Sequence, residues 1–101
     1  MNQMQQMLAQ AQRMQRELVK AHETLDAQDF TVKKAGIVEV TLKGNRTVSK
    51  VSIDAGALSA DNKEMIEDTI AMAINEALEA IKKESDAIDE RITGQKGALP
   101  F

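Results

Sequence analysis

The first quarter of the chain carries apolar residues at alternating spacings of three and four. These are the a and d positions of a heptad repeat, and the residues between them are mostly Gln, Arg, Glu and Lys. The pattern predicts a helix of about 24 residues, roughly 36 Å long, from Asn2 or Gln3 to Leu25 or Asp26. Because its apolar face is narrow, a second long helix has to cover it. The apolar positions are Met4, Met7, Ala11, Met14, Leu18, Ala21 and Leu25.

Three stretches with strand character follow this helix. The first, residues 30–32, is short. The second, residues 37–43, places Val38, Val40 and Leu42 on one face and polar residues on the other, which is the alternation of a half-buried strand. The third covers residues 46–53. Together they predict a three-stranded antiparallel meander.

The second and third stretches are separated by Gly44-Asn45, a pair typical of a two-residue hairpin loop. Such a loop pairs Lys43 with Arg46 and brings Glu39 opposite Lys50, a favourable charge pair. In this register the outer face of the hairpin carries Lys43, Arg46, Val48 and Lys50, and the inner face carries Thr47, Ser49 and Val51 beside Val38, Val40 and Leu42.

A second long helix is predicted near the end of the chain. Asp61 is its expected N-cap, with Glu64 three residues on, and Gly94 is its expected C-cap after Thr93. Its length of about 31 residues corresponds to roughly 46 Å. The apolar face is broad at first and then narrows, so we expect this helix to pack on the sheet and then to extend beside the first helix. The face comprises Ile66, Ile70, Ala73, Ile74, Ala77, Leu78, Ile81, Ile88 and Ile92.

The predicted architecture is α+β, with the order α-β-β-β-α in a single domain over residues 1–94. Residues 95–101 contain the only Pro of the chain and are expected to form a mobile tail. A chain of 101 residues buries a modest core, which favours a symmetric homodimer. It has no Cys, no apolar run long enough for a membrane span and no signal-peptide pattern, so we expect a soluble cytoplasmic protein without membrane contacts.

Candidate catalytic chemistry is sparse. His22 is the only histidine and is interpreted as a solvated side chain. No serine is paired in sequence with a general base, and the glycines punctuate turns without forming a phosphate-binding loop. We therefore predict a non-enzymatic protein without cofactor, metal or small-molecule substrate. Two carboxylate groups are expected on exposed helix surface: Glu64, Glu67 and Asp68, and Asp86, Asp89 and Glu90.

Basic residues provide one candidate binding surface. Residues 1–50 hold eight Lys and Arg against five Asp and Glu, whereas residues 51–101 hold five against eleven. Arg13, Arg16 and Lys20 share one helical stripe opposite the apolar face. Lys82 and Lys83 are expected level with the N-terminal turns of the first helix, with Arg91 and Lys96 further out.

These residues have two interpretations. They either contact the phosphates of a nucleic acid or form an ordinary solvated surface, and charge pattern alone favours the second. An isoelectric point near 5.1 and interspersed acids imply that any phosphate binding is weak and sensitive to salt. The candidate DNA-binding residues are Arg13, Arg16, Lys20, Lys82, Lys83 and Arg91.

Six parts of the chain together carry a further signal: residues 9–15, 36–40 with Gly44, 51–54, 63–68, 75–77 and the tail Leu99-Pro100-Phe101. In this order they resemble the YbaB/EbfC family of bacterial nucleoid-associated proteins. The resemblance implies a homodimer whose sheets join at the centre, paired helices projecting like the arms of tweezers, and binding of double-stranded DNA in the nucleoid. It assigns no individual contact residue.

A protein-interaction function is the alternative. Two long helices around a hairpin also describe prefoldin-like holdases, whose apolar helix tips grip unfolded proteins. Met1, Met4, Met7 and Leu8 would suit such a tip, because Met adapts to varied partners. The favoured interpretation is that these methionines pack against Ile88 and Ile92.

Overall fold

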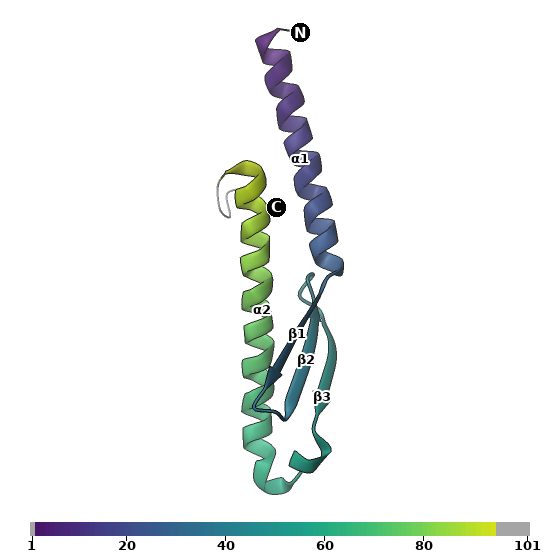
Figure 1. Cartoon of the computed structure of the whole chain (residues 1–101), viewed down its shortest axis with the longest axis vertical. Helices are drawn as coiled ribbons and strands as arrows, with labels where there is room; N and C mark the ends of the chain where they lie inside the picture. Colours follow the sequence, from purple (N-terminus) through teal and green to yellow (C-terminus); the bar gives the residue numbers. More distant parts are fainter. Residues whose placement is uncertain (1, 95–101) are drawn as a thin grey trace.

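The computed structural model describes residues 2–94 and has the predicted α-β-β-β-α order (Figure 1). Residues 95–101, expected to form a tail, lie outside the described residues. The elements are α1 (Gln3–Ala27), β1 (Asp29–Lys34), β2 (Val38–Lys43), β3 (Val48–Ile53), the 3-10 turns η1 (Ala55–Ala57) and η2 (Ala60–Asn62), and α2 (Lys63–Thr93). The three antiparallel strands form one sheet in the order β1-β2-β3, so the predicted α+β class is confirmed.

The molecule is elongated, measuring 71 × 19 × 17 Å. The sheet lies against the first part of α2, and α1 continues away from the sheet beside the last part of α2 (Figure 1). This is the predicted arrangement, in which α2 covers the sheet and then extends beyond it. Within residues 2–94, neither helix combines the length and the apolar content that a membrane crossing requires.

The main core lies between α2 and the central strand. Val38, Val40 and Leu42 alternate along β2 with half-buried polar residues and pack on α2. The small side chains of Ala73 and Ala77 let the helix approach the strand closely, so all of these residues are buried. Flanking this centre are the half-buried side chains of Phe30, Val32, Ile37, Ile70, Ile74 and Leu78, together with buried Ile81.

The predicted hairpin register is wrong. Val40 pairs with Val51 and Glu39 with Ser52, so Glu39 does not face Lys50. The difference arises in the loop, because Arg46 takes a left-handed conformation with a φ of 69° and Lys43 pairs with Thr47 instead. A turn followed by a left-handed residue makes a three-residue loop, which moves the register.

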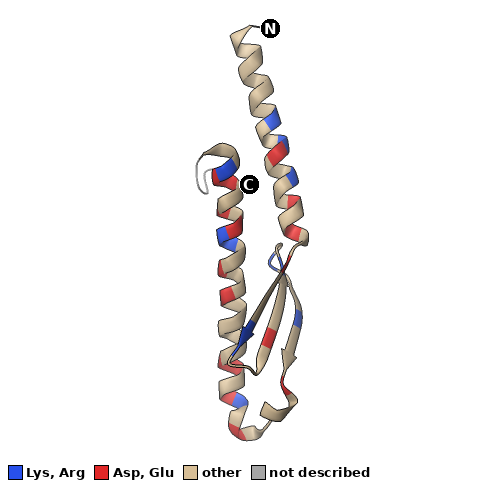
Figure 2. Cartoon of the chain, viewed as in Figure 1, with Lys and Arg blue, Asp and Glu red and all other residues tan. Residues whose placement is uncertain are grey.

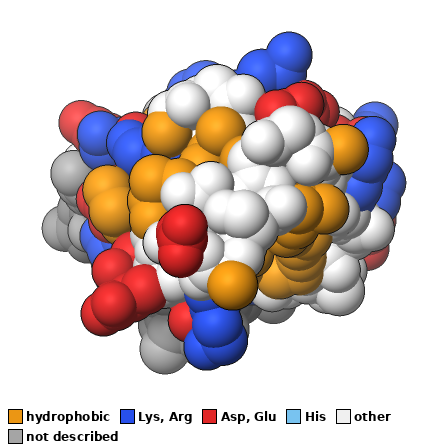
Figure 3. Space-filling model, turned by 90° about the horizontal axis from the view of Figure 1, so that it is seen from below, with side chains coloured by type: hydrophobic (Ala, Val, Ile, Leu, Met, Phe, Trp, Pro, Cys, Tyr) orange, Lys and Arg blue, Asp and Glu red, His pale blue; other side chains and the backbone are white. Residues whose placement is uncertain are grey.

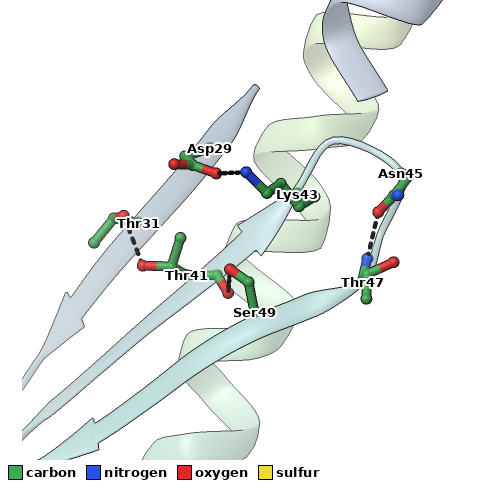
Figure 4. A network of polar contacts seen from close by, with 7 residues as sticks. All are labelled: Asp29, Thr31, Thr41, Lys43, Asn45, Thr47 and Ser49. Atoms are coloured by element: carbon green, nitrogen blue, oxygen red, sulfur yellow. Dashed lines mark hydrogen bonds and ion pairs between the residues drawn. The ribbon is translucent and has the colours of Figure 1, made fainter. Parts of the chain in front are cut away.

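A second irregularity follows at Ser49. Thr41 pairs with Lys50 and Leu42 with Val48, so Ser49 is an extra residue that bulges from β3. Its hydroxyl donates a 3.0 Å hydrogen bond to the carbonyl oxygen of Thr41 (Figure 4). The bulge puts Val48 and Val51 on the core face of the sheet, where the predicted register had placed Val48 outside.

The opposite face of the sheet carries cross-strand polar pairs (Figure 4). Thr31 and Thr41 share a 2.9 Å hydrogen bond between their hydroxyls, and Lys43 Nζ lies 2.8 Å from Asp29 Oδ1. Each pair joins directly opposed residues of β1 and β2. The charge of Lys43 is therefore compensated within the sheet.

The base of α1 is fixed to the hairpin loop. Gln28 alone separates α1 from β1, and its carbonyl accepts a 2.9 Å hydrogen bond from the Gly44 amide. Gly44 is buried so closely that a Cβ there would lie 1.8 Å from the carbonyl oxygen of Leu25. Glycine is required at this position by the close approach of two backbones.

The helix ends match the predictions in part. Asn2 and Gln5 form a capping box at the start of α1, and Gly94 ends α2 with a φ of 79° as expected. Asp61 is not the N-cap of α2. The chain enters this helix through η2, so the cap position falls on Asn62, whose side-chain amide donates instead to the Ala57 carbonyl.

Candidate nucleic-acid interface

The two helices meet beyond the sheet in a second apolar cluster. Leu18 and Leu25 of α1 and Ile88 of α2 are buried there, with Ala21, Phe30 and Ile92 packed around them. We call the whole of α1, residues 3–27, together with residues 82–93 of α2, the arm. The lower half of the heptad pattern on α1 is thus covered by α2, as predicted.

A polar contact also crosses this interface. His22 Nε2 lies 2.8 Å from Asp89 Oδ1, and Asp89 is only 7% exposed. His22 is half-buried, so its interpretation as a solvated side chain is wrong, and so is the placement of Asp89 on exposed surface. Asp89 lies three residues before Ile92, one turn away on the same side of the helix, and this spacing is the sequence signal that could have revealed its burial.

Lys82 and Lys83 do not lie level with the N-terminal turns of α1. Glu84 lines a hollow together with Leu25 and Gln28, which places the preceding lysines beside the C-terminal end of α1. The reason is that α2 is occupied by the sheet as far as Ile81. The two lysines therefore lie at the base of the arm.

The N-terminal part of α1 extends beyond the end of α2 (Figure 1). Met4, Met7 and Leu8 are 71%, 65% and 58% exposed. They do not pack against Ile88 and Ile92 within the chain, because Ile88 and Ile92 are used by residues 18–25. The prediction that Met4 and Met7 pack against Ile88 and Ile92 is therefore wrong. Met1 lies outside the described residues.

The candidate DNA-binding side chains differ in their ion pairing. All six are exposed. Within residues 2–94, Arg13, Arg16, Lys20, Lys83 and Arg91 make no ion pair shorter than 4.0 Å, whereas Lys82 Nζ lies 3.0 Å from Asp86 Oδ2. The hydrogen bond from Lys82 to Asp86 and the charge of that carboxylate raise the pKa of Lys82 above its usual value. Lys82 stays protonated, but its charge is already partly compensated.

The upper part of the arm brings several candidates together. Lys20 and Arg91 line one shallow hollow between the helices, with Glu17 and Thr24. Arg16 and Lys20 line an adjoining hollow along α1 that also includes Glu23. Arg16, Lys20 and Arg91 therefore lie close together, and Arg13 lies one helical turn before Arg16 on α1. We call these four residues the upper basic group. Lys82 and Lys83 form a separate group.

Basic residues of the sheet are mostly compensated. Lys33 pairs with Glu39, Lys34 with Glu76 and Lys43 with Asp29. Within residues 2–94, no three His, Cys, Asp or Glu side chains lie close enough together to hold a metal ion. Uncompensated positive charge is therefore more prominent on the arm than on β1 and β2.

Comparison with known proteins agrees with this geometry. A match to the YbaB/EbfC DNA-binding family spans residues 1–96, almost the whole chain. The chain belongs to this family. As a family member it is similar to nucleoid-associated proteins from Agathobacter rectalis (39% identical, covering 94% of this chain and 85% of the relative) and Mycoplasmopsis pulmonis (36% identical, covering 94% and 92%). A nucleoid-associated protein from Lachnospira eligens is 52% identical over 63% of this chain and 55% of its own length.

A solved structure shares the fold. The crystal structure of the uncharacterized protein HP0035 from Helicobacter pylori superposes with a TM-score of 0.73, covering 90% of this chain and 96% of that one, at 21% identity. The helix–sheet–helix arrangement thus also occurs at low sequence identity.

In this YbaB/EbfC protein, acidic and basic residues are interspersed along the ribbon of both arm helices (Figure 2). Glu17 and Glu23 line the same hollows as Lys20 and Arg16. A polyanion approaching the upper basic group therefore meets some repulsion, and its attraction depends on contacts with individual cations. The net charge of −3 gives no long-range attraction.

Proposed function

We propose that this protein binds double-stranded DNA as a homodimer, mainly through phosphate contacts made by basic residues on the arm, and acts in the nucleoid of the bacterial cytoplasm. The main support is the upper basic group, whose members are exposed and unpaired within residues 2–94. Membership of a DNA-binding family and the names of the relatives point the same way. Recognition by phosphate contacts carries little sequence information, which suits a protein that coats DNA.

The proposed homodimer is supported by the edge strand β3. Val48 and Val51 lie on the core face of the sheet but are 44% and 45% exposed, and no strand within residues 2–94 pairs with the outer edge of β3. Leu58 and Met65 are also exposed, near the end where α2 begins, and hydrophobic side chains are visible at this end in Figure 3. A second copy placed along β3 covers apolar surface and pairs an open edge. A two-fold dimer then carries two arms, as a duplex-binding protein needs.

Duplex DNA retardation at two salt concentrations tests the proposal. We expect binding at low salt that weakens steeply at higher salt, because each neutralised phosphate releases condensed counterions. Changing Arg13→Glu with Arg16→Glu should abolish retardation while the dimer persists in sedimentation. The matched control, Lys33→Glu with Lys63→Glu, changes net charge equally, but its lysines are paired with Glu39 and Glu67. If the variant Arg13→Glu with Arg16→Glu still binds DNA, the upper basic group is not the binding surface.

One observation favours the alternative holdase function: the apolar residues at the end of α1 are exposed. A holdase suppresses aggregation of a denatured protein and loses this activity on Met4→Ser with Met7→Ser. No DNA retardation at low salt, together with such suppression, would replace the DNA-binding proposal with the alternative.

A further inference from the structure

The free end of α1 carries an apolar stripe that α2 does not reach. We call it the tip stripe: Met4, Met7, Leu8, Ala11 and Met14. All are exposed except Met14, which is half-buried. The stripe continues the same heptad pattern whose lower residues, Leu18 and Leu25, are buried against α2. One helical seam is thus covered over its lower half and open over its upper half.

Neighbouring charge limits which partner fits the tip stripe. Residues 2–12 contain only Asn, Gln, Met, Leu and Ala, and the first charged side chain is Arg13. A charged partner therefore finds no complementary group here. Two copies of this surface meet without repulsion between like charges, which usually opposes self-association. We propose that the tip stripe binds the tip stripe of a second copy of this chain as an antiparallel two-helix contact.

Antiparallel heptads place an a residue of one helix opposite a d residue of the other. In this register Met4 meets Met14 of the second copy, and Met7 meets Ala11. In the second pair, the large Met7 side chain of one helix packs against the small Ala11 side chain of the other, as close packing favours. Arg13 comes level with Gln5 of the second copy, so the first cation of each chain meets a neutral residue.

Within the described residues, α2 ends short of the tip stripe. His22 faces Asp89 across the arm, so Thr93, one turn further along α2, lies about level with Leu18. In the proposed register, Gln3 of the second copy lies level with Gln15. A gap of about three residues, or roughly 5 Å, separates the two helix ends along α1. The incoming helix runs in the same direction as α2, so its positive N-terminal end faces the negative C-terminal end of α2.

The contact is small compared with standard protein interfaces of about 800 Å² per partner. We therefore expect weak association that depends on concentration. It differs from the proposed dimer along β3, and a protein that uses both contacts links dimers through the ends of their arms. The inference does not depend on DNA binding.

Disulfide cross-linking tests the contact and its direction, because the chain has no native cysteine. Mixing full-length Met7→Cys protein with Ala11→Cys protein under mild oxidation should give a mixed cross-linked species, and neither variant alone should cross-link comparably. Ala9→Cys is the control, since it lies at the middle of the overlap but faces away from the stripe. Equal cross-linking by each single variant contradicts the antiparallel register. No mixed product above the Ala9→Cys level overturns the contact.

Sedimentation of the uncross-linked protein gives an independent readout. Met4→Gln with Met7→Gln should raise the concentration for association beyond the dimer at least about tenfold, which is the effect of 1.4 kcal/mol. Gln6→Ala, on the outward face, should leave it unchanged. DNA binding is measured separately, by low-salt retardation with the variant Arg13→Glu with Arg16→Glu. Failure of the DNA-binding proposal is therefore distinguishable from failure of the tip contact. If Met4→Gln with Met7→Gln alters only suppression of aggregation of a denatured protein, the tip binds unfolded chains and the inference is wrong.

Discussion

His22 on α1 and Asp89 on α2 lie 67 residues apart in sequence, yet His22 Nε2 and Asp89 Oδ1 are 2.8 Å apart. The contact sits beside the apolar cluster of Leu18, Leu25 and Ile88, in the middle of the region where the helices pair. A carboxylate oxygen accepts hydrogen bonds, so the imidazole donates from Nε2. The pair shows that His22 and Asp89 lie level with each other along the two helices.

Removing either partner should loosen the arm. Asp89→Ala or His22→Ala should each lower the free energy of unfolding by about 1–2 kcal/mol, because a partly buried polar group loses its hydrogen bond. Urea denaturation measures the change. The exposed neighbour Glu90 provides the control, and Glu90→Ala should change stability by less than about 0.5 kcal/mol. Strictly additive effects in the double variant would show that the two side chains are not coupled.

The junction between α1 and the sheet should depend on a single glycine. Gly44→Ala places a methyl group against the Leu25 carbonyl oxygen, so backbone must move, and we expect a loss of about 3 kcal/mol or more. Gly36→Ala is the matched control, because Gly36 has open space around it and a φ of +70°. Left-handed strain alone costs it about 1–2 kcal/mol. Thermal unfolding of both variants should show the larger loss for Gly44→Ala, and equal losses would contradict the close approach.

Much of the fold was predictable because the spacing of apolar residues within each segment indicates its secondary structure. The three-four spacing predicted α1, and Val38, Val40 and Leu42 predicted β2. The hairpin register was not predictable, because it depends on Arg46 adopting a positive φ and on Ser49 bulging. Neither Arg nor Ser has a strong preference for these conformations, which depend on how the whole loop packs against the base of α1.

The candidate site was predictable only in part. Spacing alone placed Arg13, Arg16 and Lys20 on one stripe, and the structure leaves them exposed. The position of Lys82 and Lys83 was wrong, because it depends on how much of α2 the sheet occupies. The pairing of His22 with Asp89 likewise joins two segments that are distant in sequence. Spacing within each helix does not predict which residues of the two helices lie level with each other.

The two lysines at the base of the arm should contribute unequally to DNA binding. Lys82 is paired with Asp86, whereas Lys83 makes no ion pair within residues 2–94. Lys83→Ala should reduce the slope of log binding constant against log salt by about 0.9, the value for one phosphate contact, and Lys82→Ala should reduce it less. Titrations of a duplex at several salt concentrations measure these slopes.

Releasing Lys82 provides the reciprocal test. Asp86→Asn removes the carboxylate that holds this lysine, so binding at low salt should strengthen. Asp61→Asn removes one negative charge from η2, at the end of the molecule opposite the arm, and serves as the control. Equal strengthening by both variants would mean that net charge, and not the pairing of Lys82, governs the effect.

The proposed dimer should depend on β3. Val51→Lys puts a charge on exposed core-face surface that a second copy is expected to cover, and it should shift the protein toward monomers in sedimentation. Because Val51 is 45% exposed in the single chain, the monomer itself should remain folded by circular dichroism. Thr31→Lys, on the opposite face of the sheet, should leave the dimer intact. A dimer unaffected by Val51→Lys would place the contact elsewhere.

The unequal lengths of the paired helices have a mechanical consequence. Where α2 lies beside α1, around Lys20 and Arg91, the arm consists of two packed helices and is stiffer than a single helix. A single helix bends more easily than two packed helices, so we expect Arg13, above the end of α2, to shift more than Lys20 and Arg91. If DNA binds here as proposed, two nearly fixed cations and one adjustable cation would contact it, which would let the protein fit duplexes of varied curvature.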